Sequence, residues 1–196
     1  MKFLSLLDSL TKDSVLINKT LNEQIHMLSE NQLNWKPSAE KWSVLECLEH
    51  IMLSGQYYID EINNRLTGET PESNPLNLDF KPGIIGNYSV KSMKPGPSGE
   101  ITGKMKTFKR MEPGKSNLDQ EGVLADFARY QADLNAVIEK SKYYNLNKVK
   151  IRSSIGNLIR FKLGDALRFV VAHNQRHIQQ SLNVMKSAGF PADNSG

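Results

Sequence analysis

The sequence of 196 residues has a single cysteine, Cys47, and only four histidines. One cysteine cannot form an internal disulfide, which agrees with a reducing compartment. No apolar run approaches the roughly 20 residues that a membrane-spanning helix needs. Residues 1–10 lack a cleavage site of small residues after their short apolar stretch, so they fit a helix better than a signal peptide. We therefore expect a cytoplasmic protein without a membrane partner.

The composition also argues against a nucleic-acid partner. The formal net charge is +4, but the basic residues are spread along the chain and lack the interleaved aromatic residues of single-strand binders. Hydrophobic residues make up 39% and charged residues 23%, as in folded globular proteins. The length suits one domain over residues 1–196.

Four segments have the period of amphipathic helices, at about residues 3–30, 44–66, 118–144 and 163–188. Ser43 and Glu46 have the spacing of a capping box at the start of the second segment, where Trp42 could pack against Cys47 as a hydrophobic staple. Asn117 is the candidate cap of the third segment, and Gly189 with Pro191 ends the fourth. This pattern predicts an all-α fold, a four-helix bundle.

Two connections interrupt the helices. Residues 67–117 contain six prolines, so we expect a long crossover between the second and third helices without a helix of any length. It contains no GxGxxG or Walker pattern, and residues 92–99 are expected to be flexible. A connection of this length is often functional and could wall one side of a site. Residues 31–41 are expected to form a loop, and 145–162 an extended linker.

The residues that indicate chemistry are histidines. His173 and His177 are four residues apart in the last predicted helix, so both rings project from the same side. Neutral imidazole binds zinc, nickel, copper or iron, and a catalytic zinc usually has three protein ligands. His50, in the second predicted helix, is the candidate third ligand. The alternative interpretation is two surface histidines and a core histidine. Asn174 stands where the HExxH motif of zinc proteases has glutamate, which argues against that mechanism.

Other residues near these positions have assignable roles. Gln180 lies on the same helix face as the pair and is a candidate substrate-binding residue. Glu46 could orient the ring of His50, although the capping box is the favoured role. Arg176 is expected to face solvent, Cys47 to lie in the core, and His26 to lie on the surface.

Two stretches of the chain resemble the DinB-like (DinB/YfiT) proteins. They are residues 42–50, preceded by Trp-Lys-Pro at 35–37, and residues 161–180. The resemblance covers nearly the whole chain in element order. It implies a four-helix bundle with a three-histidine site for one divalent metal, falling on His50, His173 and His177. Zinc or nickel is the first candidate, with iron or manganese as alternatives.

The resemblance also implies an activity. Family members with an assigned role resemble metal-dependent transferases that act with low-molecular-weight thiols such as bacillithiol or mycothiol, or thiol-dependent isomerases; others are described as hydrolases. We therefore expect a thiol-dependent S-transferase that acts on a small-molecule substrate. A metal-dependent hydrolase and a non-enzymatic metal- or ligand-binding bundle are the alternatives, and the chain could form a homodimer.

Overall fold

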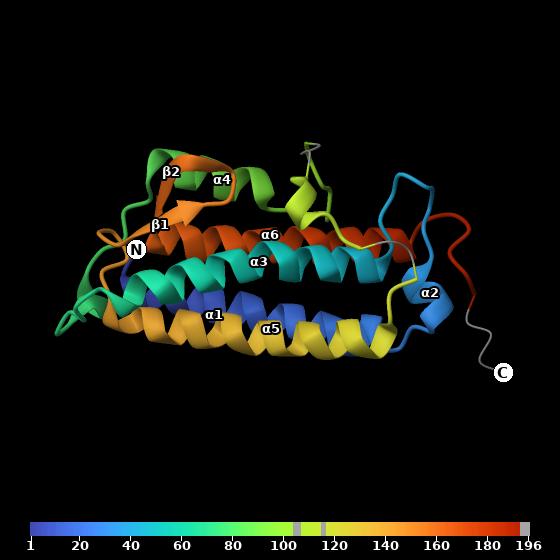
Figure 1. The fold of residues 1–196 in the computed structure, drawn as a ribbon, viewed down its shortest axis with the longest axis horizontal. Helices are drawn as coiled ribbons and strands as arrows, with labels where there is room; N and C mark the ends of the chain where they lie inside the picture. Colours follow the sequence, from blue (N-terminus) through green and yellow to red (C-terminus); the bar gives the residue numbers. More distant parts are fainter. Residues whose placement is uncertain (104–106, 115–116, 193–196) are drawn as a thin grey trace.

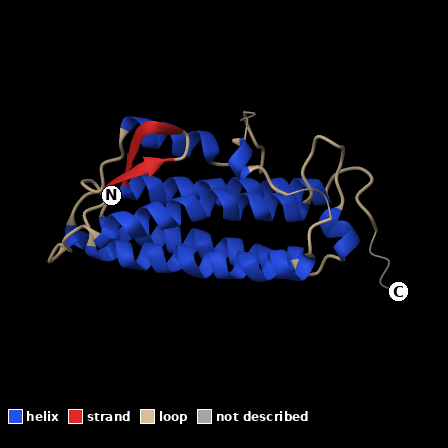
Figure 2. Cartoon of the chain, viewed as in Figure 1, coloured by secondary structure: helices blue, strands red, loops and turns tan. Residues whose placement is uncertain are grey.

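The computed structural model describes residues 1–103, 107–114 and 117–192. The chain is mostly helical (Figure 2). Four long helices run alongside one another (Figure 1). They are α1 (Phe3–Thr20), α3 (Val44–Thr67), α5 (Gln120–Lys140) and α6 (Leu163–Met185). Helices α1 and α3 each pack against both α5 and α6. The core between them is apolar and includes the fully buried Leu7, Ile51, Phe127 and Leu167.

The first long helix ends earlier than predicted. After one π-helical turn, Leu21–Ile25, the chain bends and starts the short helix α2 (Glu30–Asn34). The Ser29 hydroxyl accepts a hydrogen bond from the amide of Gln32, and the Gln32 side chain accepts one from the amide of Ser29. The prediction of one helix to residue 30 and a loop over 31–41 was wrong, because this capping box begins a new helix.

The start of α3 was predicted correctly. The amide of Glu46 donates to the Ser43 hydroxyl at 3.1 Å, and the amide of Ser43 donates to the Glu46 carboxylate at 2.7 Å. Helix α5 instead begins at Gln120 and is capped by Asp119, whose carboxylate accepts from the amide of Gly122. The predicted cap, Asn117, lies outside the helix with a positive φ of 67°.

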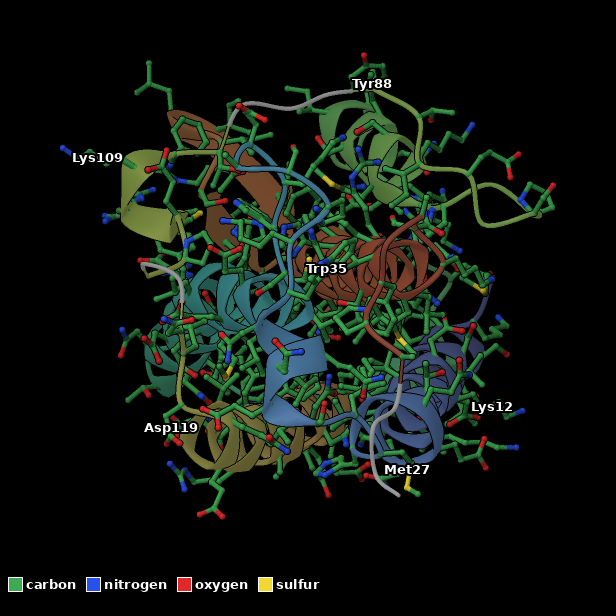
Figure 3. The ribbon with its side chains drawn as sticks, turned by 90° about the vertical axis from the view of Figure 1, so that its right-hand side faces the viewer. Lys12, Met27, Trp35, Tyr88, Lys109 and Asp119 are labelled. Carbon is green, nitrogen blue, oxygen red and sulfur yellow. The ribbon has the colours of Figure 1, made fainter. Side chains whose placement is uncertain are left out.

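The crossover contains a helix that the sequence analysis excluded. Helix α4 (Ile84–Met93) packs on α6. Its buried residues are the small Gly86 and Ser89 together with Val90 and Met93, whereas Ile84, Ile85 and Tyr88 are exposed. Figure 3, which looks along the long helices, shows Tyr88 on the outside of the molecule. The helix was not predicted because the prolines of the crossover indicate turns, and because apolar residues lie on both the buried and the exposed sides of α4.

Small residues let α4 approach α6 closely. A Cβ atom at Gly86 would lie 2.6 Å from the Cβ of Asp165, so only glycine fits there. The buried Asp165 carboxylate accepts a hydrogen bond from the amide of Gly83 at 2.7 Å and forms an ion pair with Arg168 at 3.0 Å. These contacts fix the start of α4 against α6.

The expected linker between the last two long helices is a β-hairpin. Strands β1 (Lys150–Ser153) and β2 (Gly156–Lys162) pair antiparallel, with Ile151 opposite Phe161. Side chains in β1 alternate between exposed and buried, as expected for a strand with one covered face. The hairpin packs on α3 and α6. The chain is therefore mostly helical rather than all-α.

Three short 3-10 turns, Pro75–Asn77, Lys109–Met111 and Ser141–Tyr143, complete the described elements. Within the predicted crossover and C-terminal tail, residues 104–106, 115–116 and 193–196 lie outside the described residues. Among the described helices, none is both long and apolar enough to cross a membrane.

Candidate metal centre

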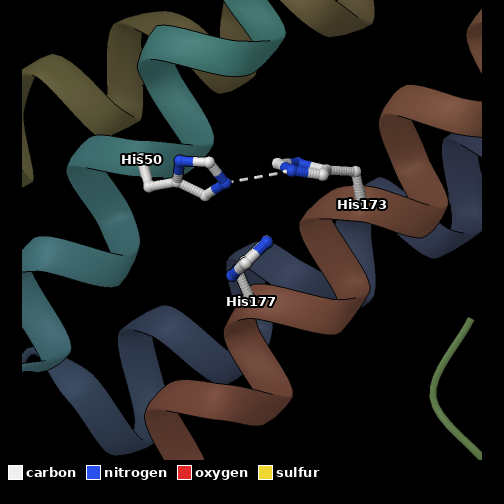
Figure 4. Close-up of side chains that lie close together, drawn as sticks. All are labelled: His50, His173 and His177. Carbon is white, nitrogen blue, oxygen red and sulfur yellow. Dashed lines mark hydrogen bonds between the residues drawn. The ribbon is translucent and has the colours of Figure 1, made fainter. Parts of the chain in front are cut away.

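Three histidines from two helices converge on one point (Figure 4). His50 comes from the second turn of α3, which the capping box at Ser43 sets in register, and His173 and His177 come from successive turns of α6. All are buried, with 4%, 6% and 8% of their surface exposed, respectively. Their potential ligand atoms lie within 4.8 Å of one another. The three positions predicted from sequence are therefore brought together, and they could hold a metal ion.

The distance between two of the ring nitrogens fits their coordination to the same metal ion. The Nε2 atoms of His50 and His173 are 3.2 Å apart. Two nitrogens that each lie about 2.05 Å from a tetrahedral metal ion are separated by about 3.3 Å. The centroid of the His177 ring is 4.4 Å from that of His50 and 4.5 Å from that of His173. The donor set, three imidazoles without a carboxylate, suits zinc, nickel, copper or iron.

Hydrogen bonds fix the orientation of two rings. Nδ1 of His50 donates to the backbone carbonyl of Met111 at 2.7 Å. A carbonyl only accepts, so the proton is on Nδ1, and Nε2 keeps its lone pair for a metal. Nδ1 of His177 likewise donates to Oε1 of Gln180 at 2.9 Å. Such partners of the second nitrogen are typical of metal-binding histidines.

Burial keeps the three rings neutral. It lowers the pKa of His50 despite the opposing hydrogen bond to Met111, and it lowers the pKa of His177 to about 3. The pKa of His173 falls well below its ordinary value, first through burial and then through repulsion from its neighbours. Neutral imidazole is the form that binds metal. The site is therefore poised to bind a cation without first losing protons near neutral pH.

Aromatic side chains surround the histidines. The Trp42 ring lies 4.7 Å from the His50 ring and 5.9 Å from the His177 ring, centroid to centroid. Phe169 stacks on His173 at 6.1 Å. Sequence analysis assigned Trp42 only a packing role at the start of α3. Trp42 lies two residues before the helix that was predicted to carry His50 on its inner face. This position was the signal that Trp42 could border the histidine cluster.

The histidines open onto a cavity of about 850 Å³. Besides α3 and α6, its walls include Met93 at the end of α4 and residues of connecting segments, namely Pro37, Lys41, Ile101, Phe108 and Ser154. The crossover thus walls one side of the site, as the sequence analysis suggested it could. Its contribution of the Met111 carbonyl was not predictable, since every residue carries a carbonyl.

Of the roles predicted for Glu46 and Gln180, one is confirmed and one stays a prediction. Glu46 bonds the amide of Ser43 and pairs with Lys36 at 2.9 Å, so the favoured capping role is confirmed, and the partner of the His50 ring is Met111. Gln180 borders the cavity and holds His177; its contact with a substrate stays a prediction.

The positions of Cys47, His26 and Arg176 in the fold were also predicted from sequence. Cys47 is fully buried, as expected, and burial raises its pKa to about 12. His26 is exposed, as expected. The prediction that Arg176 faces solvent was wrong, because only 7% of its surface is exposed. Burial lowers the pKa of its guanidinium.

A family model described as the DinB superfamily matches residues 18–181, which include all three histidines. The chain belongs to the DinB superfamily. No curated protein and no solved structure matches it. Family membership and the buried histidine cluster therefore agree on a site that could hold a metal, as the resemblance implied.

Proposed function

We propose that this DinB superfamily protein is a metal-dependent enzyme, a thiol-dependent S-transferase whose divalent metal is held by His50, His173 and His177. The observation that carries the proposal is the convergence of three buried, neutral imidazoles on one wall of a large cavity. Zinc and nickel are the preferred candidates, because both bind imidazole nitrogen. We take the four long helices to be the family's bundle, with residues 67–117 as its crossover.

The role of the chain's own residues follows from their contacts. Met111 and Gln180 hold two of the rings with Nε2 directed to a common point. Trp42 and Phe169 shield the rings and provide apolar surface for a substrate. When bound, a divalent metal supplies a Lewis acid that lowers the pKa of a coordinated thiol, so that the thiol is present as the nucleophilic thiolate.

The cavity favours transfer over hydrolysis. Hydrolysis at a metal centre commonly uses a carboxylate or another general base beside the reacting water. Among the described residues that line the cavity, the one carboxylate belongs to Glu40, which is exposed and accepts a hydrogen bond from Ser38. A thiolate needs no such base once its proton has left. In the proposed reaction a C–S bond forms, the leaving group departs with its electron pair, and the thiol proton passes to solvent.

Two measurements on protein without a histidine tag test the proposal. Elemental analysis should find about one divalent metal per chain. Conjugation of a small thiol to 1-chloro-2,4-dinitrobenzene should be faster with the metal-loaded protein than without protein, and a chelator should abolish the difference. Turnover that persists after the metal has been removed and shown to be absent would refute the metal-dependent mechanism.

A further inference from the structure

Among the residues that the structure describes, one buried cation of the cavity has no acidic partner. Arg176 precedes the candidate ligand His177 on α6, lines the cavity and is only 7% exposed. Its guanidinium donates to the backbone carbonyls of Thr102 at 3.0 Å and Gly103 at 2.6 Å. No carboxylate of the described residues forms an ion pair with it. A guanidinium has five N–H groups, so donors remain after these two bonds.

Another arginine of the same helix shows the usual arrangement. Arg168 pairs with the buried carboxylate of Asp165 at 3.0 Å and also donates to Asn87. Its charge is therefore balanced within the fold. Burial of a charged group without a counter-charge costs free energy, and neutral carbonyls offset that cost only in part. Within the described part of the chain no carboxylate balances the charge of Arg176, and Arg176 lines a cavity that a ligand can enter.

The other charges around the cavity do not balance it. Glu40 and Lys41 border the cavity as exposed residues of opposite sign, so they contribute no net charge. The three histidines are either neutral or positive, so they supply no counter-charge to Arg176. A divalent metal on them would add two further positive charges. The interior of the cavity is therefore suited to an anion.

We propose that one of the two small molecules that react in this cavity carries a carboxylate, and that Arg176 binds it. The planar fork of a guanidinium matches a carboxylate with two parallel hydrogen bonds. Arg176 lines the same cavity as the three histidines, so one small molecule can carry both the carboxylate and the reacting atom. This inference rests on the proposed function in taking the cavity as the place where the reactants bind.

Calorimetric titration of the metal-loaded protein with a matched pair of thiols tests the inference. The probes are 3-mercaptopropionate and its uncharged analogue 3-mercaptopropionamide. The wild-type protein should bind the carboxylate at least about tenfold more tightly, as expected for a charge-assisted hydrogen bond. Arg176→Gln should reduce this ratio to near one while the metal content stays unchanged. The control Arg129→Gln removes an exposed arginine that pairs with Asp126 on α5, and should keep the ratio.

The ratio of the two affinities distinguishes binding of the carboxylate by Arg176 from a role of Arg176 in holding the crossover in place. If Arg176 only held residues 102–103, its replacement would weaken both probes alike and leave their ratio unchanged, and this result would overturn the inference. Equal binding of the two probes by the wild type would overturn it as well. If Arg176→Gln does not fold by circular dichroism, Arg176→Lys keeps the charge without the fork, and its ratio should fall several-fold; an unchanged ratio again contradicts the proposal.

Failure of the proposed function gives a different result. If elemental analysis finds no metal, the metal-dependent mechanism fails, and the titration is repeated on the metal-free protein with propionate and propionamide. A preference for propionate that Arg176→Gln removes would then support the carboxylate site by itself. A preference that survives this change would place the anion elsewhere and refute the role of Arg176.

Discussion

The two walls of the cavity contribute different things to the histidine cluster. The helical wall, formed by α3 and α6, carries all three imidazoles and Gln180. The connecting wall, formed by Met93 at the end of α4 and by segments 37–42, 101–103, 107–111 and 154–155, brings the Met111 carbonyl to His50 and two carbonyls to Arg176. The helical wall thus supplies the atoms that could bind a metal. The connecting wall orients the ring of His50 and forms the side of the cavity that faces the histidines.

The helical wall has a regular backbone, whereas the backbone of the connecting segments is irregular. Ligands on helices are held by a regular backbone and a packed core, so their relative positions tolerate changes elsewhere. Connecting segments are where proteins of one fold differ in the ligands they accept. We therefore expect changes in the helical wall to act on metal binding, and changes in the connecting wall to act on stability and ligand choice.

The largest effect should follow from removing a ligand in the helical wall. His173→Ala leaves two imidazoles, and we expect metal affinity to fall by at least about 100-fold. Loss of a residue that only hydrogen-bonds a metal ligand already costs about 10- to 100-fold. Competition with a chromophoric chelator measures the affinity. The matched control is His26→Ala, which removes an exposed histidine outside the cluster and should leave the affinity unchanged. Undiminished binding in His173→Ala would show that the helical wall does not form the site.

A change of pH tests the burial of the three cluster histidines in the helical wall. Burial depresses the pKa of all three cluster histidines in the folded chain. The unfolded chain then binds more protons below about pH 6.5, so the stability of metal-free protein is complete above that pH and is lost as the pH falls. The loss should approach about 1.4 kcal/mol per pH unit for each histidine.

Chemical denaturation of chelator-treated protein between pH 8 and pH 5 measures this loss. His177→Leu, which removes one of the depressed groups, should show a shallower dependence than the wild type. Equal slopes for the two proteins would mean that His177 is not buried as the structure has it.

The helical wall could be predicted from sequence because its signals are periodic. The four-residue spacing of His173 and His177 and the capping box before His50 each determine a direction on a helix. Both signals are local and depend on side-chain type. The length of α3 and the position of His50 on it followed from the same reasoning.

The connecting wall could not be predicted because its contacts lack such a signal. Helix α4 buries glycine and serine beside Val90 and Met93 and exposes two isoleucines, so its apolar residues do not mark a single buried face, which is the signal on which helix prediction depends. The environment of Arg176 depends on where residues 102–103 lie, and a backbone carbonyl carries no side-chain signature. The hairpin was missed because its alternating side chains were interpreted as an extended linker.

A substitution behind the connecting wall should affect stability more than metal binding. In Gly86→Val the new side chain would overlap Asp165, so α4 must move away from α6, and we expect a loss of about 1–3 kcal/mol in the free energy of unfolding. Metal affinity should change less than threefold, because α4 supplies no ligand. Gly68→Ala should be nearly neutral, because a Cβ at Gly68 would meet only the carbonyl oxygen of Arg65, at an ordinary contact distance of 3.9 Å. A large loss of metal from folded Gly86→Val would mean that the two walls are not separable.

The smallest effect concerns the orientation of a single ring. His50 is held by a carbonyl of the connecting wall, but His177 is held by Gln180 from the helical wall itself. Gln180→Ala removes the acceptor of Nδ1, so the ring can rotate and its preferred tautomer is lost, and we expect metal affinity to fall by about tenfold. The neighbouring Gln179 bonds Asn183 instead, so Gln179→Ala is the matched control. If both variants kept full affinity while Gln180→Ala weakened binding of a thiol probe, Gln180 would be a substrate contact, and packing alone would orient His177.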